Sequence, residues 1–127
     1  MSYYISRRVE GSFDEVVDRT VAALDEQGFG VLTDIDIKAT MHAKLGVDFR
    51  PYRILGACNP PFAHQALLAE DKIGTMLPCN VVVQQLDSGV EIAAVDPLAS
   101  MQAVENPNLG EIAQEVRERL RAAVEAA

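Results

Sequence analysis

The sequence predicts an α+β fold, a two-layer sandwich in which a mainly antiparallel sheet of about five strands is backed by two long helices. Two observations support this prediction. Five short stretches have the residue pattern of strands, and a longer amphipathic stretch of helical periodicity lies near each end of the chain. The length of 127 residues fits one domain, residues 1–127, with enough chain to bury a core without cross-links.

The first long helix is expected between Ser12 and Gly28. Ser12 and Glu15 have the spacing of a capping box, and Gly28 is a typical C-terminal stop. Apolar residues between them repeat at helical spacing and form one stripe. The last helix should follow Asn106-Pro107-Asn108, which offers a cap, and its stripe begins at Leu109. We expect both helices on the same face of the sheet.

The five strands are expected from alternation and from residues that favour a pleated surface. They are Ser2 to Val9, Gly30 to Ile35, Tyr52 to Cys58, Cys79 to Leu86 and Val90 to Val95. Asp87-Ser88-Gly89 predicts a hairpin between the last two. Shorter helices are expected at Ile37 to Leu45, where Asp36 is the cap, at Pro60 to Glu70, and as one turn at Leu98 to Met101.

Composition argues against several classes of function. The net charge is −8, with 19 acidic and 11 basic residues, and no basic patch offsets it, so we expect no nucleic-acid binding. No apolar run approaches the length of a membrane span, and the N-terminus has no secretory signal. We therefore expect this acidic protein in the cytoplasm, without membrane contact.

The candidate site lies in the stretch Tyr52 to Val83, which contains both cysteines, each followed by an asparagine. Cys58 precedes Asn59-Pro60-Pro61, a good helix start, so its thiol should lie near a positive helix end that favours thiolate. Cys79 opens the next strand. We expect the two sulfurs to be neighbours at one edge of the sheet. The candidate ligand-binding residues are Cys58, Asn59, Cys79, Asn80 and Gly56.

Simpler roles compete with chemistry at each position. Buried free cysteines often serve only for packing. Asn59 is the expected helix cap, Asn80 can bridge backbone groups, and Gly56 predicts a bulge or a close approach of backbone or ligand. The carboxylates near strand ends, Asp34, Asp36, Asp48 and Asp96, are explained by caps and turns. No recognisable catalytic constellation or phosphate loop is present.

A soft metal ion between the cysteines would need further ligands. The available side chains are His64, His42, Met76 and Met41, but both histidines lie off the apolar side of their helices and are expected at the surface. We therefore assign no metal ligands, and the sequence does not identify a cofactor.

Three segments carry a family resemblance, L-G-V-D-F-R-P-Y-R-I-L-G-A-C-N-P (45–60), A-H-Q-A-L (63–67) and I-G-T-M-L-P-C-N-V-V-V (73–83). Together with F-D-E-V-V-D-R-T (13–20) and G-F-G-V-L-T-D-I-D (28–36), they make the chain resemble the domain of unknown function 302 family along essentially its whole length. The resemblance implies an antiparallel sheet backed by helices, a homodimer, and no established enzyme activity. The positions that match the family pattern are Gly56, Cys58, Asn59, Pro60, Leu77, Pro78, Cys79 and Asn80.

Three functional hypotheses follow. The first is a small binding domain that holds a small-molecule ligand or a thiol-reactive species at Cys58 and Cys79. The second is a dithiol redox or soft-metal protein that handles copper or zinc. The third is a structural homodimer in which the cysteines have no chemical role.

Overall fold

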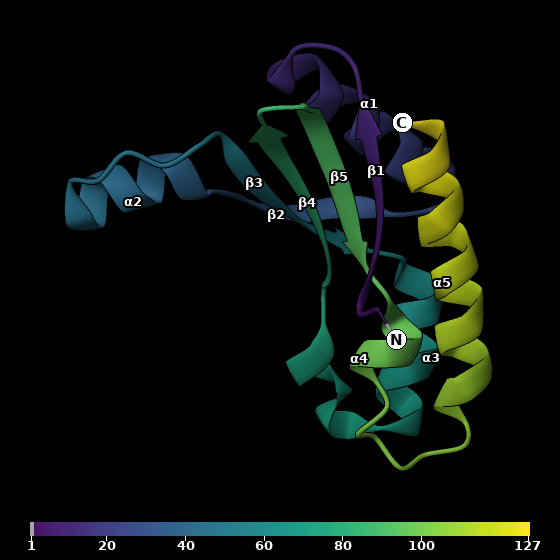
Figure 1. Ribbon diagram of the computed structural model, residues 1–127. Helices are drawn as coiled ribbons and strands as arrows, with labels where there is room; N and C mark the ends of the chain where they lie inside the picture. Colours follow the sequence, from purple (N-terminus) through teal and green to yellow (C-terminus); the bar gives the residue numbers. More distant parts are fainter. Residues whose placement is uncertain (1) are drawn as a thin grey trace.

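The computed structural model describes residues 2–127 and has one five-stranded sheet with helices packed on it (Figure 1). The strands are ordered β1-β5-β4-β3-β2, and all neighbours are antiparallel. The predicted fold class is therefore confirmed. The strands are β1 (Tyr4–Val9), β2 (Gly30–Asp36), β3 (Tyr52–Cys58), β4 (Cys79–Leu86) and β5 (Gly89–Val95). The helices are α1 (Phe13–Glu26), α2 (Ile37–Leu45), α3 (Pro60–Ala69), the 3₁₀ helix η1 (Asp71–Met76), α4 (Pro97–Ser100) and α5 (Leu109–Ala126).

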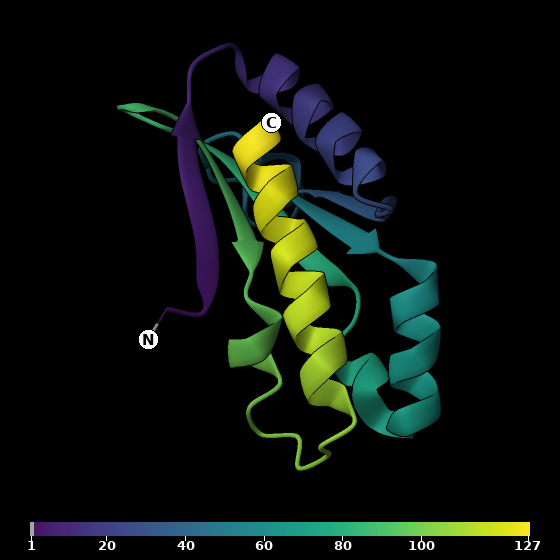
Figure 2. The ribbon, with the colours of Figure 1, turned by 90° about the vertical axis from the view of Figure 1, so that its right-hand side faces the viewer.

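The two long helices, α1 and α5, pack side by side on one face of the sheet, as predicted (Figure 2). Their stripes meet the inward residues of the central strands. Val16 and Leu24 of α1 and Leu120 of α5 are almost fully buried against β4 and β5, which contribute Val81 and Ile92. Fully burying one such side chain contributes about 1.5–3 kcal/mol, so this layer is the main source of stability.

Local capping accounts for most helix boundaries. The Ser12 hydroxyl accepts a hydrogen bond from the Glu15 amide (3.3 Å), and the Asp36 carboxylate accepts one from the Ala39 amide (2.9 Å). The hairpin prediction is also confirmed, since Leu86 pairs with Gly89 around a two-residue turn. At α5 the cap lies in the predicted segment Asn106-Pro107-Asn108. Asn108 occupies the cap position without a side-chain cap bond, and its backbone N–H donates to the side-chain oxygen of Asn106 (3.0 Å).

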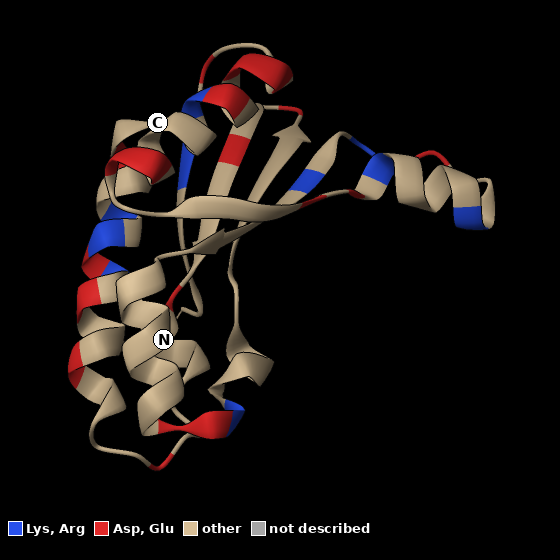
Figure 3. Ribbon diagram, turned by 180° about the vertical axis from the view of Figure 1, so that it is seen from behind, with Lys and Arg blue, Asp and Glu red and all other residues tan. Residues whose placement is uncertain are grey.

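The second face of the sheet is largely open, and α2 projects away from the body of the domain at the far end of β2 and β3 (Figure 1). Arg53 of β3 forms a bidentate ion pair with Asp34 of β2 at the base of this projection. Arg53 lowers the pKa of Asp34, mainly through the side-chain hydrogen bond. Charged residues of both signs are interspersed along α1 and α5, whereas the charged residues of α2 are lysines (Figure 3). None of the helices within residues 2–127 combines the length and the hydropathy that a bilayer crossing requires.

Candidate functional site

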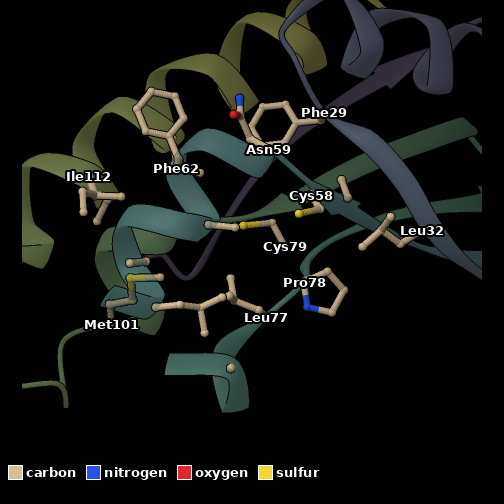
Figure 4. Close-up of a pocket in the computed structure, with 17 residues that line it drawn as sticks. Phe29, Leu32, Cys58, Asn59, Phe62, Leu77, Pro78, Cys79, Met101 and Ile112 are labelled. Carbon is tan, nitrogen blue, oxygen red and sulfur yellow. The ribbon is translucent and has the colours of Figure 1, made fainter. Parts of the chain in front are cut away.

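A cavity of about 360 Å³ lies where β3 ends and β4 begins, under α3 and α5 (Figure 4). Its walls are almost entirely carbon and sulfur. The rings of Phe29 and Phe62 lie on one side in this view, and Leu77 and Pro78 lie on the other. The large apolar side chains that line it are Phe29, Leu32, Phe62, Leu77, Met101 and Ile112.

The chain path explains why the cavity forms here. After Cys58 the chain leaves the sheet and enters α3, and it returns through η1 to begin β4 at Cys79. In the β3–β4 ladder Ala57 is opposite Cys79, and Gly56 is opposite Asn80. The α3 and η1 excursion therefore encloses space against α5 instead of filling it.

The structure does not bring the cysteines together as a pair, so that prediction is wrong. Both are free, Cys58 half-buried and Cys79 buried. The reason is the register. Cys79 pairs with Ala57, and successive residues of a strand point to opposite faces, so Cys79 shares the helix-covered face while Cys58 belongs to the other side of the pleat. Both residues nevertheless line the same cavity.

The environment of Cys79 makes it an unreactive thiol. Burial raises the pKa of the Cys79 thiol to about 11, and a smaller electrostatic contribution from Cys58 acts in the same direction. Only thiolate is nucleophilic, so Cys79 remains protonated and inert near neutral pH. Of the two cysteines, Cys58 is the more exposed.

The raised pKa predicts a loss of stability in alkali. The folded-state pKa of Cys79 lies above the ordinary value of 9.0, so the folded form holds the proton more tightly than the unfolded form. Its contribution to stability is intact below about pH 9 and is lost as pH rises through about 11, a change on the order of 2–3 kcal/mol. Urea unfolding of the wild type and of Cys79→Ala at pH 8, 9, 10 and 11 should reveal this difference. A Cys58→Ala variant is the matched control, and equal pH dependence in the wild type and Cys79→Ala would contradict the assignment.

Asn59 occupies the N-cap position of α3, as predicted, but its side chain does not cap the helix. It is 7% exposed, and its amide nitrogen donates to the Gln27 carbonyl oxygen (3.3 Å) across the structure. That nitrogen lies 3.0 Å from the point where a Cβ on Gly28 would stand, and Gly28 has a φ of +86°. Glycine at position 28 therefore both ends α1 and leaves room for Asn59.

The start of α3 offers Cys58 less positive charge than the sequence suggested. Pro60 and Pro61 have no N–H, and the Ala63 amide is bonded to the Asn59 carbonyl oxygen (2.9 Å). Since the charge at a helix end comes from unsatisfied N–H groups, only the Phe62 amide of the first turn is left to supply it.

Gly56 and Asn80, the other two candidate residues, do not line the cavity. Gly56 is buried, and a Cβ there would stand 2.1 Å from the Thr33 hydroxyl oxygen and 2.8 Å from a Pro78 ring carbon. The close approach expected at Gly56 is therefore present. Asn80 is exposed and lines a separate groove on the open face of the sheet, outside the cavity.

The residues weighed as extra metal ligands do not join the cysteines. His42 and His64 are both exposed, and Met41 and Met76 are not among the cavity-lining residues. Within residues 2–127 there is no group of three or more His, Cys, Asp or Glu side chains placed to hold an ion.

Sequence reasoning missed much of the cavity wall. Phe29, Met101 and Ile112 come from three segments outside the central stretch. The helical stripe that includes Ile112 indicated burial, but nothing in the sequence showed that it would line a cavity rather than fill a core.

Comparison with known proteins agrees with the architecture. The family model described as "Domain of unknown function DUF302" matches residues 5–127. A crystal structure of an uncharacterized conserved protein DUF302 from Bacillus stearothermophilus superposes with a TM-score of 0.93 at 30% sequence identity, covering 99% of this chain and 98% of that chain. Among curated proteins, none matches this chain.

Proposed function

We propose that this chain, which belongs to the family described as domain of unknown function DUF302, binds a small apolar molecule in the cavity beside Cys58. The observation that carries the proposal is the cavity itself. Its volume of about 360 Å³ falls within the range of small-molecule sites, which are commonly about 300–1,000 Å³. The nearly apolar lining, rather than the volume, distinguishes this cavity from the groove on the open face of the sheet, which is of similar size and more polar.

The lining favours an apolar ligand. Among the described lining residues, Asn59 supplies the one amide side chain, and its nitrogen is already bonded to Gln27. A strongly polar or charged molecule would lose hydrogen bonds to water without replacing them here, which costs several kcal/mol. An aromatic or aliphatic molecule instead gains contacts with Phe29, Phe62 and Leu77.

Cys58 adds a nucleophilic side chain to the apolar cavity. It is half-buried at the wall of the cavity, whereas Cys79 is held protonated by burial. A ligand that carries an electrophilic carbon would therefore meet a usable nucleophile at Cys58 only. This narrows the thiol-reactive version of the hypothesis to one residue.

A fluorescent uncharged probe, N-phenyl-1-naphthylamine, tests the proposal. The wild type should bind the probe with enhanced fluorescence, and Ala63→Phe should abolish binding because Ala63 lines the cavity on α3 and the ring would fill it. Leu68→Phe is the matched control, since Leu68 is on the same helix, 75% exposed and outside the cavity. Equal binding by the two variants, with unchanged circular dichroism, would refute the proposal.

Thiol labelling tests whether Cys58 reacts, separately from whether the cavity binds the probe. N-ethylmaleimide should modify one thiol in the native protein, Cys58→Ser should remove that reaction, and bound probe should slow it. If Cys58→Ser combined with Cys79→Ser leaves probe affinity unchanged, the two cysteines line the cavity but their thiols do not contribute to binding. The redox and soft-metal alternative requires instead that the two sulfurs exchange a bond or share an ion, and their separation by the pleat argues against it.

Three broader proposals accompany this function. We propose that residues 1–127 act as a single domain, since one sheet and one main core run through them. We propose a cytoplasmic location, because two free thiols suit a reducing compartment. The homodimer expected for the family is a further proposal, and it does not depend on the ligand.

A further inference from the structure

A groove of about 380 Å³ on the open face of the sheet is lined by all three tyrosines of the chain. Tyr4 begins β1, Tyr52 begins β3, and Tyr3 directly precedes β1. The rings of Tyr3 and Tyr4 meet edge to face, with their centres 5.0 Å apart. The groove shares no lining residue with the cavity beside Cys58, so a ligand bound here would be independent of the function proposed above.

Glu91 is the one charged residue among the described residues that line the groove. Its side chain is 20% exposed, and its Oε1 accepts a hydrogen bond from the Gln84 side-chain nitrogen (3.0 Å). Its Oε2 lies 4.0 Å from Nε of Arg8, the outer limit of an ion pair. The Arg8 side chain is 59% exposed, and its Nη1 donates to the Ser88 hydroxyl (2.7 Å). Glu91 therefore presents a half-buried negative charge whose nearest cation contributes little.

The pleat of the sheet sets the order of side chains along the groove. Residues two apart on a strand share a face, so Glu91, Ala93 and Val95 of β5 form one line. Ala93 is opposite Val82 of β4, and Val95 is opposite Tyr4 of β1. The line from Glu91 to Val95 covers about 13 Å. The groove thus has a carboxylate toward one end, an apolar floor, and an aromatic side chain toward the other end.

We propose that this groove binds a small organic cation, a primary ammonium group carried by an elongated apolar or aromatic body. The ammonium group donates to Oε2 of Glu91, and a hydrogen bond between charged groups is about twice as strong as one between neutral groups. The body of the ligand lies over Val82 and Ala93 and reaches the ring of Tyr4. The volume of the groove is adequate, since small-molecule sites commonly have about 300–1,000 Å³.

Charge favours a cation over an anion or a neutral molecule of the same shape. The net charge of −8 attracts cations to the whole chain, and the Glu91 carboxylate repels anions from the groove. A neutral molecule that covered Glu91 would remove water from the carboxylate without replacing its hydrogen bonds. Aromatic faces also attract cations, and the Arg50 guanidinium already stacks on Tyr52, 5.6 Å from the ring centre. The groove therefore selects a charged ligand, whereas the cavity excludes one.

Tyrosine fluorescence tests binding at this groove, because the chain has no tryptophan and its three tyrosines all line the groove. The probe 4-phenylbutylamine should change the fluorescence in a saturable way. The similarly shaped 4-phenylbutan-1-ol and 4-phenylbutanoate should bind at least about tenfold more weakly, and added NaCl should weaken binding of the amine. Ala63→Phe, which fills the cavity, should leave amine binding unchanged, so failure of the proposed function and failure of this inference are distinguishable.

Two substitutions should change amine affinity in opposite directions. Glu91→Gln keeps the shape and an acceptor for Gln84 but removes the charge, so the affinity should fall at least about tenfold. Arg8→Ala removes the competing cation and should raise the affinity about threefold. Glu111→Gln and Lys44→Ala, at exposed positions elsewhere, make the same changes in net charge and should have no effect. Equal affinity for the amine and the alcohol, wild-type amine affinity in Glu91→Gln with unchanged circular dichroism, or a lower affinity in Arg8→Ala would overturn the inference.

Discussion

Replacing Gly56 with alanine should lower the free energy of unfolding by about 3 kcal/mol, the upper end of the cost of overpacking a core. Gly56 lies in β3 between β2 and β4, with Thr33 as its partner in the β2 ladder. A Cβ would stand 2.1 Å from the Thr33 hydroxyl oxygen and 2.8 Å from the Pro78 ring. Both distances are far below van der Waals contact. The side chains on either side must therefore move, and with them the strand segments that carry them.

Gly30→Ala is the matched control for this substitution. Gly30 lies in the adjacent strand β2, and nothing stands within 4 Å of the position its Cβ would take. Urea denaturation followed by circular dichroism should show a large loss for Gly56→Ala and a change within about 0.5 kcal/mol for Gly30→Ala. Adding Thr33→Ala to Gly56→Ala should recover part of the loss, because it removes the nearer clash. Equal stability of the two glycine variants would contradict the packing argument.

The clash at Gly56 also connects stability with the cavity. Pro78 contacts the Gly56 position on one side and lines the cavity on the other. A Cβ at residue 56 would displace Pro78, so the cavity depends on a glycine that does not line it. Gly56 thus acts on the candidate site through packing rather than through contact with a ligand.

The elements of this fold could be predicted because their signals are local. The capping residues at Ser12 and Asp36, the hairpin turn after Leu86 and the amphipathic stripes of α1 and α5 each depend on residues a few positions apart. Strong local patterns of this kind are also what makes a two-layer α+β domain recognisable.

The relation between the cysteines could not be predicted, because it depends on register. A one-residue change in the pairing of β3 with β4 would move Cys79 to the other face of the sheet, and no local pattern fixes that register. The same limit applies to α2. Its stripe of Ile37, Met41 and Leu45 indicates a buried side, yet none of its nine residues is buried.

The cavity and the groove on the open face of the sheet are separate surfaces. The cavity lies on the helix-covered side near the end of β3, and the groove of the open face shares none of its lining residues. A substitution at the cavity, such as Ala63→Phe, should therefore leave the open face of the sheet unchanged.

Asp96→Ala should be nearly as destabilising as Gly56→Ala, by about 3 kcal/mol, through loss of a cap and a partly buried ion pair. Asp96 follows β5 and is 8% exposed. One carboxylate oxygen accepts from the Leu98 amide at 3.0 Å and caps α4, and the other accepts from Nε of Arg117 on α5, also at 3.0 Å. Removing the carboxylate leaves the Arg117 guanidinium with the exposed Glu118 as its remaining ion-pair partner. The end of the sheet would lose its polar link to α5.

Asp96→Asn separates the two contributions. The asparagine oxygen can still cap α4, so this variant should lose only the part due to charge, about 1–2 kcal/mol. Asp18→Ala, at an exposed position of α1, is the control and should change stability by less than about 0.5 kcal/mol. Urea unfolding of all three variants should show the largest loss of stability for Asp96→Ala, a smaller loss for Asp96→Asn and the smallest for Asp18→Ala. If Asp96→Ala proved no more destabilising than Asp18→Ala, then α4 and α5 must be held at the end of β5 by apolar packing alone, and the carboxylate would be a surface feature rather than a structural one.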